Sequence, residues 1–307
     1  MATVRYRVVH ETVYEYSEAV TSSHQLAHLI PRATPWQEVL SSRVDVTPTP
    51  GERSQATDYF GNPVVRLFVE SPHQGLAVRA DSIVEVTGHA PDPDAPSPPW
   101  ELAATPTEGR GDDGIEIEQY RLASPMIPCL EGCAAYARES FAPGRPWLES
   151  AYELTRRIRA DFKYDPAATD LSTPVAEVLA TRKGVCQDFA NLMISGLRSL
   201  NIPARYVSGY VLNRVAPGQA RLAGADASHA WVAAHCPDLG WVAFDPTNGK
   251  LADLEFVTLG WGREFYDVTP LRGVVLGAAT QTMEVAVTVE TLAGAVEPAP
   301  TSGAVRP

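Results

Sequence analysis

Hydrophobic and polar residues alternate along the first part of the chain, and no helical repeat appears before about residue 90. Turn-forming clusters such as TPTPGERSQ and ESPHQG separate the alternating runs. Strands are predicted over residues 4–16, 40–47, 64–70 and 76–86. Alternation with a period of two is typical of strands that bury one face, so residues 1–90 are predicted to form an all-β, sandwich-like domain.

Residues 91–118 interrupt this pattern. They include PDPDAPSPPWELAATPTEGRGDDG, in which Pro, Gly and Asp dominate and no periodicity remains. Such a composition indicates a linker between domains. Residues 119–290 are then expected to form a second domain that ends in a strand, and residues 291–307 a disordered tail.

The clearest helix of the second domain is predicted in KGVCQDFANLMISGLRSL. Its apolar residues, from Phe189 to Leu200, recur at the spacing of a helix with one buried face. Cys186 lies three residues before Phe189, in the first turn and on that face, where the helix dipole favours a thiolate. Taken alone, a single helical cysteine is more often a small buried core thiol.

After this helix, hydrophobic and polar residues again alternate with a period of two. PARYVSGYVL, SHAWVAAHC and GWVAFD are predicted strands, and a hairpin turn near residue 239 joins the last two. Asp245 ends the hairpin before an Asx-type turn and His229 begins it, so the two side chains are expected to lie close together. His235 shares the face of His229 but lies about 20 Å along the strand, and Cys236 points to the opposite face.

Four blocks in this order, GVCQDFANL, IPARYVSGY, DASHAW and GWVAFDPTNG, resemble the bacterial branch of the transglutaminase-like superfamily. YRVVHETVYEY near the N-terminus resembles the β domain that precedes the core in those proteins. The resemblance implies an α+β fold, with an N-terminal all-β sandwich-like domain followed by a papain-like core. In that core, a helix bearing the cysteine packs on an antiparallel sheet bearing the histidine and the aspartate.

The resemblance also implies a catalytic triad, with Cys186 as nucleophile, His229 as base and Asp245 as the orienting carboxylate. The sequence departs from many relatives at Asn191, where they carry histidine. Because Asn191 lies five residues beyond Cys186, about 140° around the helix, the triad itself is unaffected.

A Cys–His–Asp triad performs acyl transfer through a thioester. If an amine resolves the thioester, the result is transamidation; if water does, it is deamidation or hydrolysis. We therefore expect a cysteine-dependent enzyme that acts on a carboxamide or peptide bond of a protein or peptide, with an amine as a second possible acceptor. The alternative is a binding or scaffold module that keeps the fold without turnover.

The backbone N–H of Cys186 is a candidate oxyanion donor. Gln187, Trp231 and Trp241 are further oxyanion or substrate candidates, although each also fits a packing or capping role. Residues 168–183 and 215–226 should build the substrate groove, but they carry no diagnostic motif.

The amino-acid composition limits the kinds of partner that the protein is expected to bind. A net charge of -12 without a basic patch argues against nucleic acid or an anionic membrane as a partner. No signal-peptide pattern or membrane-length apolar run is visible, so the four cysteines are expected to be free thiols in a cytoplasmic protein. The pair Cys129 and Cys133 lacks a second pair with ligand spacing, and no cofactor motif occurs, so neither a metal nor a cofactor is expected.

Overall fold

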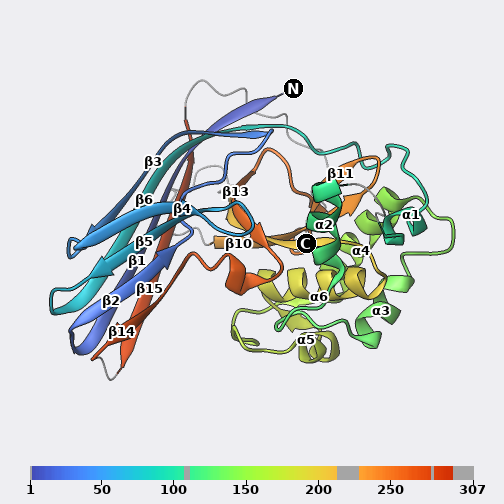
Figure 1. Cartoon of the computed structure of the whole chain (residues 1–307). Coiled ribbons are helices and arrows are strands. Elements are labelled where there is room, and N and C mark those ends of the chain that lie inside the picture. The colour runs from blue at the N-terminus through green and yellow to red at the C-terminus, as the bar shows by residue number, and fades with distance from the viewer. Residues whose placement is uncertain (1, 107–110, 213–227, 278–279, 293–307) are drawn as a thin grey trace, which may run out of the picture.

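A computed structural model describes residues 2–106, 111–212, 228–277 and 280–292. The chain forms two units that lie side by side, a β-sandwich and a mixed helix–sheet core (Figure 1). The expected order of an all-β unit followed by an α+β core is confirmed.

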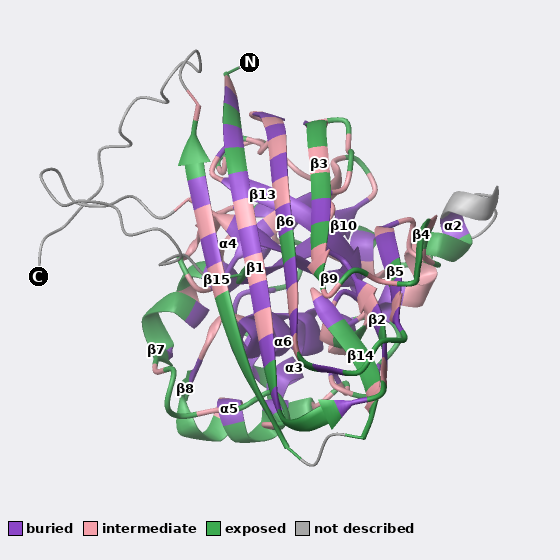
Figure 2. Ribbon diagram, turned by 90° about the vertical axis from the view of Figure 1, so that its left-hand side faces the viewer, coloured by how far each residue is buried: buried purple, intermediate pink, exposed green. Residues whose placement is uncertain are grey.

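Two antiparallel four-stranded sheets build the sandwich. Their strand orders are β15-β1-β6-β3 and β14-β2-β5-β4. Figure 2 shows buried and less buried residues alternating along β1 and β6, as expected for strands with one face in a core. The strands are β1 (Thr3–Val20), β2 (Ser22–Ala27), β3 (Gln37–Thr47), β4 (Glu52–Thr57), β5 (Pro63–Val69), β6 (His73–Thr87), β14 (Leu271–Leu276) and β15 (Gln281–Thr291).

The C-terminal strands were assigned to the wrong unit. We expected the last strand to belong with the core, but β15 pairs with β1 from Tyr6↔Thr291 to Tyr16↔Gln281, and β14 pairs with β2. A period of two identifies a strand without identifying its partner, which explains the error. The core is therefore inserted between β6 and β14 of the sandwich.

The segment 91–118 is not a free linker. It contains α1 (Glu101–Ala104) and α2 (Gly111–Glu118). The backbone N–H of Trp147 donates to the Pro98 carbonyl, and that of Trp100 donates to the Arg145 carbonyl. Prolines remove regular periodicity from a sequence, but they also suit an ordered, irregular segment that packs on the surface of a domain. The described part of residues 91–118 forms such a segment.

The core packs helices on one face of a five-stranded antiparallel sheet of order β12-β11-β10-β9-β13. Among the described residues, no helix combines the length and the apolar character needed to cross a membrane. The sheet strands are β9 (Ala204–Val211), β10 (Ser228–Cys236), β11 (Gly240–Asp245), β12 (Lys250–Leu251) and β13 (Phe256–Gly262). The remaining elements are α3 (Glu131–Arg138), α4 (Trp147–Asp161), α5 (Val175–Thr181), α6 (Cys186–Ser199), the 3-10 turns η1 (Gln119–Arg121) and η2 (Phe265–Asp267), and the short strands β7 (Lys163–Tyr164) and β8 (Lys183–Gly184).

Helix α6 is the centre of the core. Its predicted apolar face, which includes Phe189, Met193 and Leu197, is buried together with Val232 and Cys236 of β10. The prediction that Cys236 faces away from His229 and has a structural role is confirmed, because the thiol lies in this cluster. The other face of β10 contributes to a separate aromatic cluster.

Long strands couple the sandwich rigidly to the core. The first residues on the inner face of β1, including Tyr6, pack against the core strand β13, and later residues of the same face pack inside the sandwich. The side-chain amide of Gln37 donates a hydrogen bond to the Thr258 carbonyl and accepts one from the Thr258 backbone N–H. The side-chain amide of Asn62 donates to the Trp261 carbonyl and accepts from the Trp261 backbone N–H. Each buried amide is thus used as both donor and acceptor across the interface.

Candidate active site

Cys186 is the first residue of α6, and the chain turns sharply to place it there. The Asp188 carboxylate accepts hydrogen bonds from the Val185 backbone N–H at 2.8 Å and from the Thr169 hydroxyl at 2.6 Å. A Cβ on Gly184 would come within 2.7 Å of that carboxylate, so only glycine fits. The thiol is partly exposed at the positive end of a buried helix.

His229 and Asp245 meet as the hairpin geometry predicts. The Nε2 atom of His229 lies 2.9 Å from Oδ2 of Asp245, and the aspartate is fully buried. This contact leaves Nδ1 as the ring nitrogen available to Cys186, whose side chain also hydrogen-bonds His229. The structure therefore brings all three predicted side chains together.

Asn248 is a member of the site that sequence reasoning missed. Its Nδ2 donates to Oδ2 of Asp245 at 2.6 Å, and the backbone N–H groups of Thr247 and Asn248 donate to Oδ1. Four hydrogen bonds, including that of His229, hold the carboxylate in one orientation. The signal was present in the sequence as the Asx turn of DPTN, which we interpreted only as a strand terminator.

These contacts decide the charge of the histidine. Burial is the largest influence and lowers the pKa of His229, but the hydrogen bonds and negative charges of Asp245 and Cys186 outweigh it and raise that pKa to about 10. Burial alone would raise the pKa of Asp245, yet the hydrogen bond and charge of His229 leave it below its usual value. At neutral pH the pair is therefore an imidazolium beside a carboxylate.

The raised pKa predicts a pH-dependent stability. Because the pKa of His229 rises from 6.5 to about 10 on folding, its stabilising effect is complete below 6.5 and is lost as the pH rises through 10. We expect the free energy of unfolding of the wild type, relative to His229→Gln, to fall by at most about 1.4 kcal/mol per pH unit in that range. Urea unfolding of both proteins from pH 6 to pH 10 measures this difference, and a constant difference would contradict the ion pair.

Aromatic rings fix the position of the imidazole. Trp231 stacks on His229 with a centroid distance of 6.2 Å and an interplanar angle of 28°, and Phe256 lies 6.1 Å away. Beneath them is Gly209 of β9, which pairs directly with His229. A Cβ at Gly209 would approach the Val257 carbonyl oxygen to 2.1 Å and the Trp231 ring to 2.6 Å.

Gly209→Ala is therefore expected to be strongly destabilising. The added methyl meets rigid backbone as well as the ring that holds His229, so we expect a loss of about 3 kcal/mol or more in the free energy of unfolding. Gly88→Ala is the matched control, because its Cβ would meet ordinary contacts no closer than 3.6 Å. Urea unfolding measures both, and similar stabilities of the two variants would contradict the close packing at Gly209.

The other residues that the sequence suggested for the site differ in where the structure places them. Trp231 contacts the imidazole, and Gln187 is buried next to Cys186 in the first turn of α6. Trp241 was wrongly grouped with the site, because it pairs with His235 at the turn end of the hairpin, about 20 Å along the strand from His229. Asn191 is buried, and its Oδ1 has no hydrogen-bond partner among the described residues.

Two tyrosines that are influenced by the thiol were not anticipated. Burial raises the pKa of Tyr206 and Tyr164, and the charge of Cys186 raises both further. Tyr206 is buried in the core, whereas Tyr164 is half exposed. Of the two expected groove segments, residues 168–183 are part of the described structure, and residues 215–226 lie outside the described residues.

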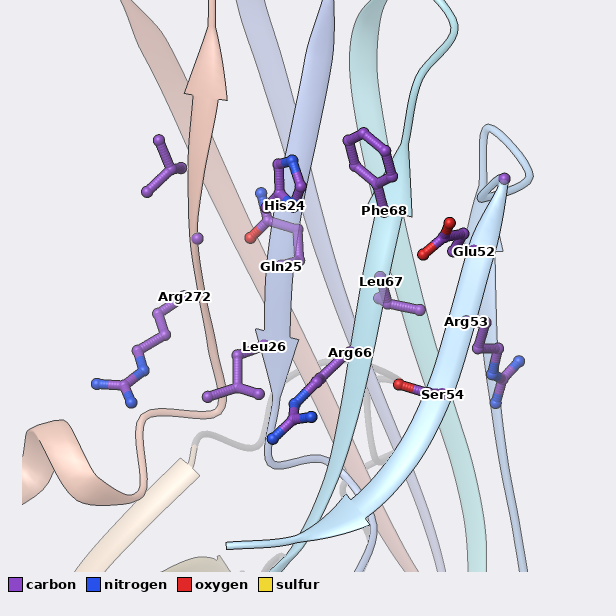
Figure 3. A pocket seen from close by; sticks show the side chains of 13 residues that line it. His24, Gln25, Leu26, Glu52, Arg53, Ser54, Arg66, Leu67, Phe68 and Arg272 are labelled. Carbon is purple, nitrogen blue, oxygen red and sulfur yellow. The ribbon is translucent and has the colours of Figure 1, made fainter.

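A large hollow lies on the sandwich, and none of the three triad side chains lines it. It is a groove of about 830 Å³ over the outer face of the β14-β2-β5-β4 sheet. Figure 3 shows His24 and Phe68, which stack at 4.0 Å, together with Arg66 and Arg272. Within the described part of the chain, no three His, Cys, Asp or Glu side chains form a metal-binding group.

Comparisons with known proteins agree with this arrangement. The sequence profile of the bacterial transglutaminase-like N-terminal region matches residues 6–85, and that of the transglutaminase-like superfamily matches residues 134–246. The uncharacterised protein Rv2569c of Mycobacterium tuberculosis is 40% identical over 280 residues, which cover 89% of this chain and 88% of that protein.

Two further comparisons concern proteins with a stated activity. A protein-glutamine gamma-glutamyltransferase of Pseudomonas aeruginosa is 35% identical over 102 residues, but these are 31% of this chain and 15% of that enzyme. The crystal structure of a candidate cysteine protease from Cytophaga hutchinsonii shares the fold, with a TM-score of 0.74, 20% identity and coverage of 97% of this chain and 94% of that one. The chain belongs to the bacterial branch of the transglutaminase-like superfamily.

Proposed function

We propose that the protein is a cysteine-dependent acyl-transfer enzyme that acts on a carboxamide or peptide bond of a protein or peptide. One observation carries the proposal: a partly exposed thiol at the start of a buried helix contacts a histidine whose far nitrogen is bonded to a fully buried aspartate. A merely structural thiol has no need of a buried ion pair that is itself costly to assemble.

The chemistry follows from the protonation states. The Cys186 thiolate attacks the carbonyl carbon, and the imidazolium of His229 gives its Nδ1 proton to the leaving ammonia or amine. The acyl group is then a thioester on Cys186. An incoming amine or water loses its proton to Nδ1 as it attacks, the thioester carbon–sulfur bond breaks, and the thiolate–imidazolium pair is restored.

Asp245 keeps the imidazole in one tautomer throughout this cycle. Its Oδ2 accepts the Nε2 proton, so that Nδ1 is always the nitrogen that exchanges protons with substrate. The backbone N–H of Cys186 at the helix start is suited to the oxyanion, since it points out of the positive end of α6. Gln187 is a candidate for the second donor.

The experiment that tests the proposal is intact-mass spectrometry of peptide substrates. A pool of peptides with Gln, Asn and ordinary amide bonds is incubated with the reduced protein and a primary amine, with Cys186→Ala in parallel. Amine addition that requires Cys186 identifies a transamidase, a gain of about 1 Da identifies a deamidase, and shorter fragments identify a protease.

The alternative of a non-catalytic module makes a different prediction. If no peptide changes, the rate at which iodoacetamide alkylates Cys186 at pH 7 decides between the two. A Cys186 that reacts no faster than the exposed Cys129 would favour the binding module, despite the triad geometry.

We further propose that the protein works in the cytoplasm. All four cysteines are free in the structure, and a thiol nucleophile needs a reducing compartment or protection from oxidation. Fractionation of cells that produce the tagged protein tests this, and recovery outside the cytoplasm would overturn it.

A further inference from the structure

Another buried charge lies in the core, four residues along β9 from Gly209, the partner of His229. Arg205 of β9 is only 4% exposed, and its guanidinium stacks on two tryptophans, with the central carbon 4.2 Å from the Trp241 ring and 3.7 Å from the Trp261 ring. Burial lowers the pKa of Arg205 to about 9, so the side chain is still a cation at neutral pH. Such stacking covers the faces of a guanidinium and leaves the N–H groups at its edge to find acceptors elsewhere.

At least one of those N–H groups has no acceptor. The Nε atom of Arg205 is buried without a hydrogen-bond partner, and no carboxylate among the described residues forms an ion pair with this guanidinium. The carboxylate of Glu116 favours the charged form of Arg205, but less than burial opposes it. A buried cation without a directly paired counter-charge is unfavourable.

The neighbouring unpartnered groups are also hydrogen-bond donors. The indole Nε1 of Trp261 is buried without a partner, as is the hydroxyl of Tyr120, which packs edge-on against Trp241 at 5.2 Å. Burial raises the pKa of Tyr120, so its hydroxyl keeps its proton. A region with a surplus of donors and a positive charge calls for a negatively charged acceptor.

A second guanidinium strengthens the positive field. Arg32 stacks on Trp261 at 3.6 Å, and its N–H groups donate to the Phe60 carbonyl and the Asn62 amide, both neutral. Its nearest acidic groups, Asp58 and Glu116, act on it only weakly compared with burial, which lowers its pKa. Two cations thus share one tryptophan at the junction of the sandwich and the core.

The space available limits what can bind. Arg205, Trp241 and Trp261 line a cavity of about 20 Å³, and Trp36 and His89 of the sandwich side also contribute to its lining. Since about 10–15 Å³ holds one water, the cavity accepts one particle of that size and excludes phosphate and sulfate. A water would satisfy donors but would leave the charge uncompensated.

We propose that this cavity binds a single small inorganic anion, chloride under cellular conditions, against the guanidinium of Arg205. The anion balances the buried charge and ties the sandwich to the core at their junction. The cavity shares Trp231 and Phe256 with the aromatic rings around His229, but it contains no triad side chain, and the proposal does not depend on the proposed enzymatic activity.

Thermal unfolding tests the proposal in solution. In potassium chloride, compared with potassium gluconate at the same ionic strength, the wild type should unfold about 3 °C higher, with saturation as chloride rises. Arg205→Met keeps the stacked aliphatic stem and should lose the chloride-specific shift. Arg66→Met, which removes an exposed arginine of the groove in Figure 3, should retain it.

Bromide in crystals provides a second measurement that does not require the variant to fold. Crystals of the wild type grown or soaked in sodium bromide should give an anomalous peak in the cavity, in contact with Arg205. The proposal is overturned if the cavity contains only water in bromide crystals, or if Arg205→Met keeps the full chloride shift.

Discussion

Replacing Cys186 by alanine is expected to lower turnover by about 10⁴-fold or more and to leave the fold intact. The reason for the loss is that Cys186 is the nucleophile that contacts His229 among the described residues. The fold should survive because Cys186 is partly exposed at the first position of α6, and the helix is held by Asp188 and by its buried face. Turnover in the peptide assay and the unfolding temperature measure the two effects.

Cys129→Ala is the matched control for this variant. Cys129 is the most accessible thiol of the chain. If the activity depended only on an exposed thiol, it would be lost in Cys129→Ala and kept in Cys186→Ala. Iodoacetamide mapping at pH 7 should modify Cys186 about tenfold faster than Cys129 despite its lower exposure. A Cys186→Ala protein with full activity would rule out the thioester mechanism.

Asp245→Asn is expected to lower kcat by about 10³- to 10⁴-fold, with a smaller effect on KM. Two backbone N–H groups point at Oδ1, so the amide oxygen of the new asparagine will take that position. Its NH₂ then faces Nε2 of His229 and the Nδ2 of Asn248. A donor facing Nε2 forces the imidazole proton onto Nδ1, where it blocks the nitrogen that must act as base.

The pH profile separates this electrostatic effect from a packing defect. Asp245 is one of the groups that raise the pKa of His229 to about 10, so the variant should lose activity at a lower pH on the alkaline side than the wild type does. Asp238→Asn, at the exposed turn of the same hairpin, is the control and should change neither kcat nor the profile. An unshifted alkaline limb in Asp245→Asn would contradict the proposed role of the carboxylate.

The elements that carry the triad were predictable from local periodicity, and the resemblance to the family implied that the three residues act together. An apolar helix face identifies α6 and places Cys186 in its first turn, and a hairpin brings its first and last residues together whatever surrounds it. Trp241 was misplaced for the same reason: it is near Asp245 in sequence, but the hairpin register pairs it with His235. The position of Trp241 in the hairpin, at the turn end and opposite His235, should have decided its assignment.

What depends on non-local contacts could not be predicted. The alternation in β15 indicates a strand, yet nothing in eleven residues says that the partner is β1 rather than β13. Arg205 likewise sits in an unremarkable strand sequence, and its burial between two tryptophans follows only from the packing of β9, β11 and β13. Side-chain hydrogen bonds such as that of Asn248 require a turn conformation that a motif only suggests.

The pairing of β15 with β1 has a consequence for how the chain is made. A ribosome releases β1 before the whole inserted core and β15 after it, so while the core is synthesised the longest strand of the sandwich has one edge without its partner. Closure of the sheet across the whole inserted core is a slow step, because the two strands must find each other over a long stretch of chain. During that interval the bare edge of β1 is a site for pairing with other chains, and the nascent protein is most in need of a chaperone then.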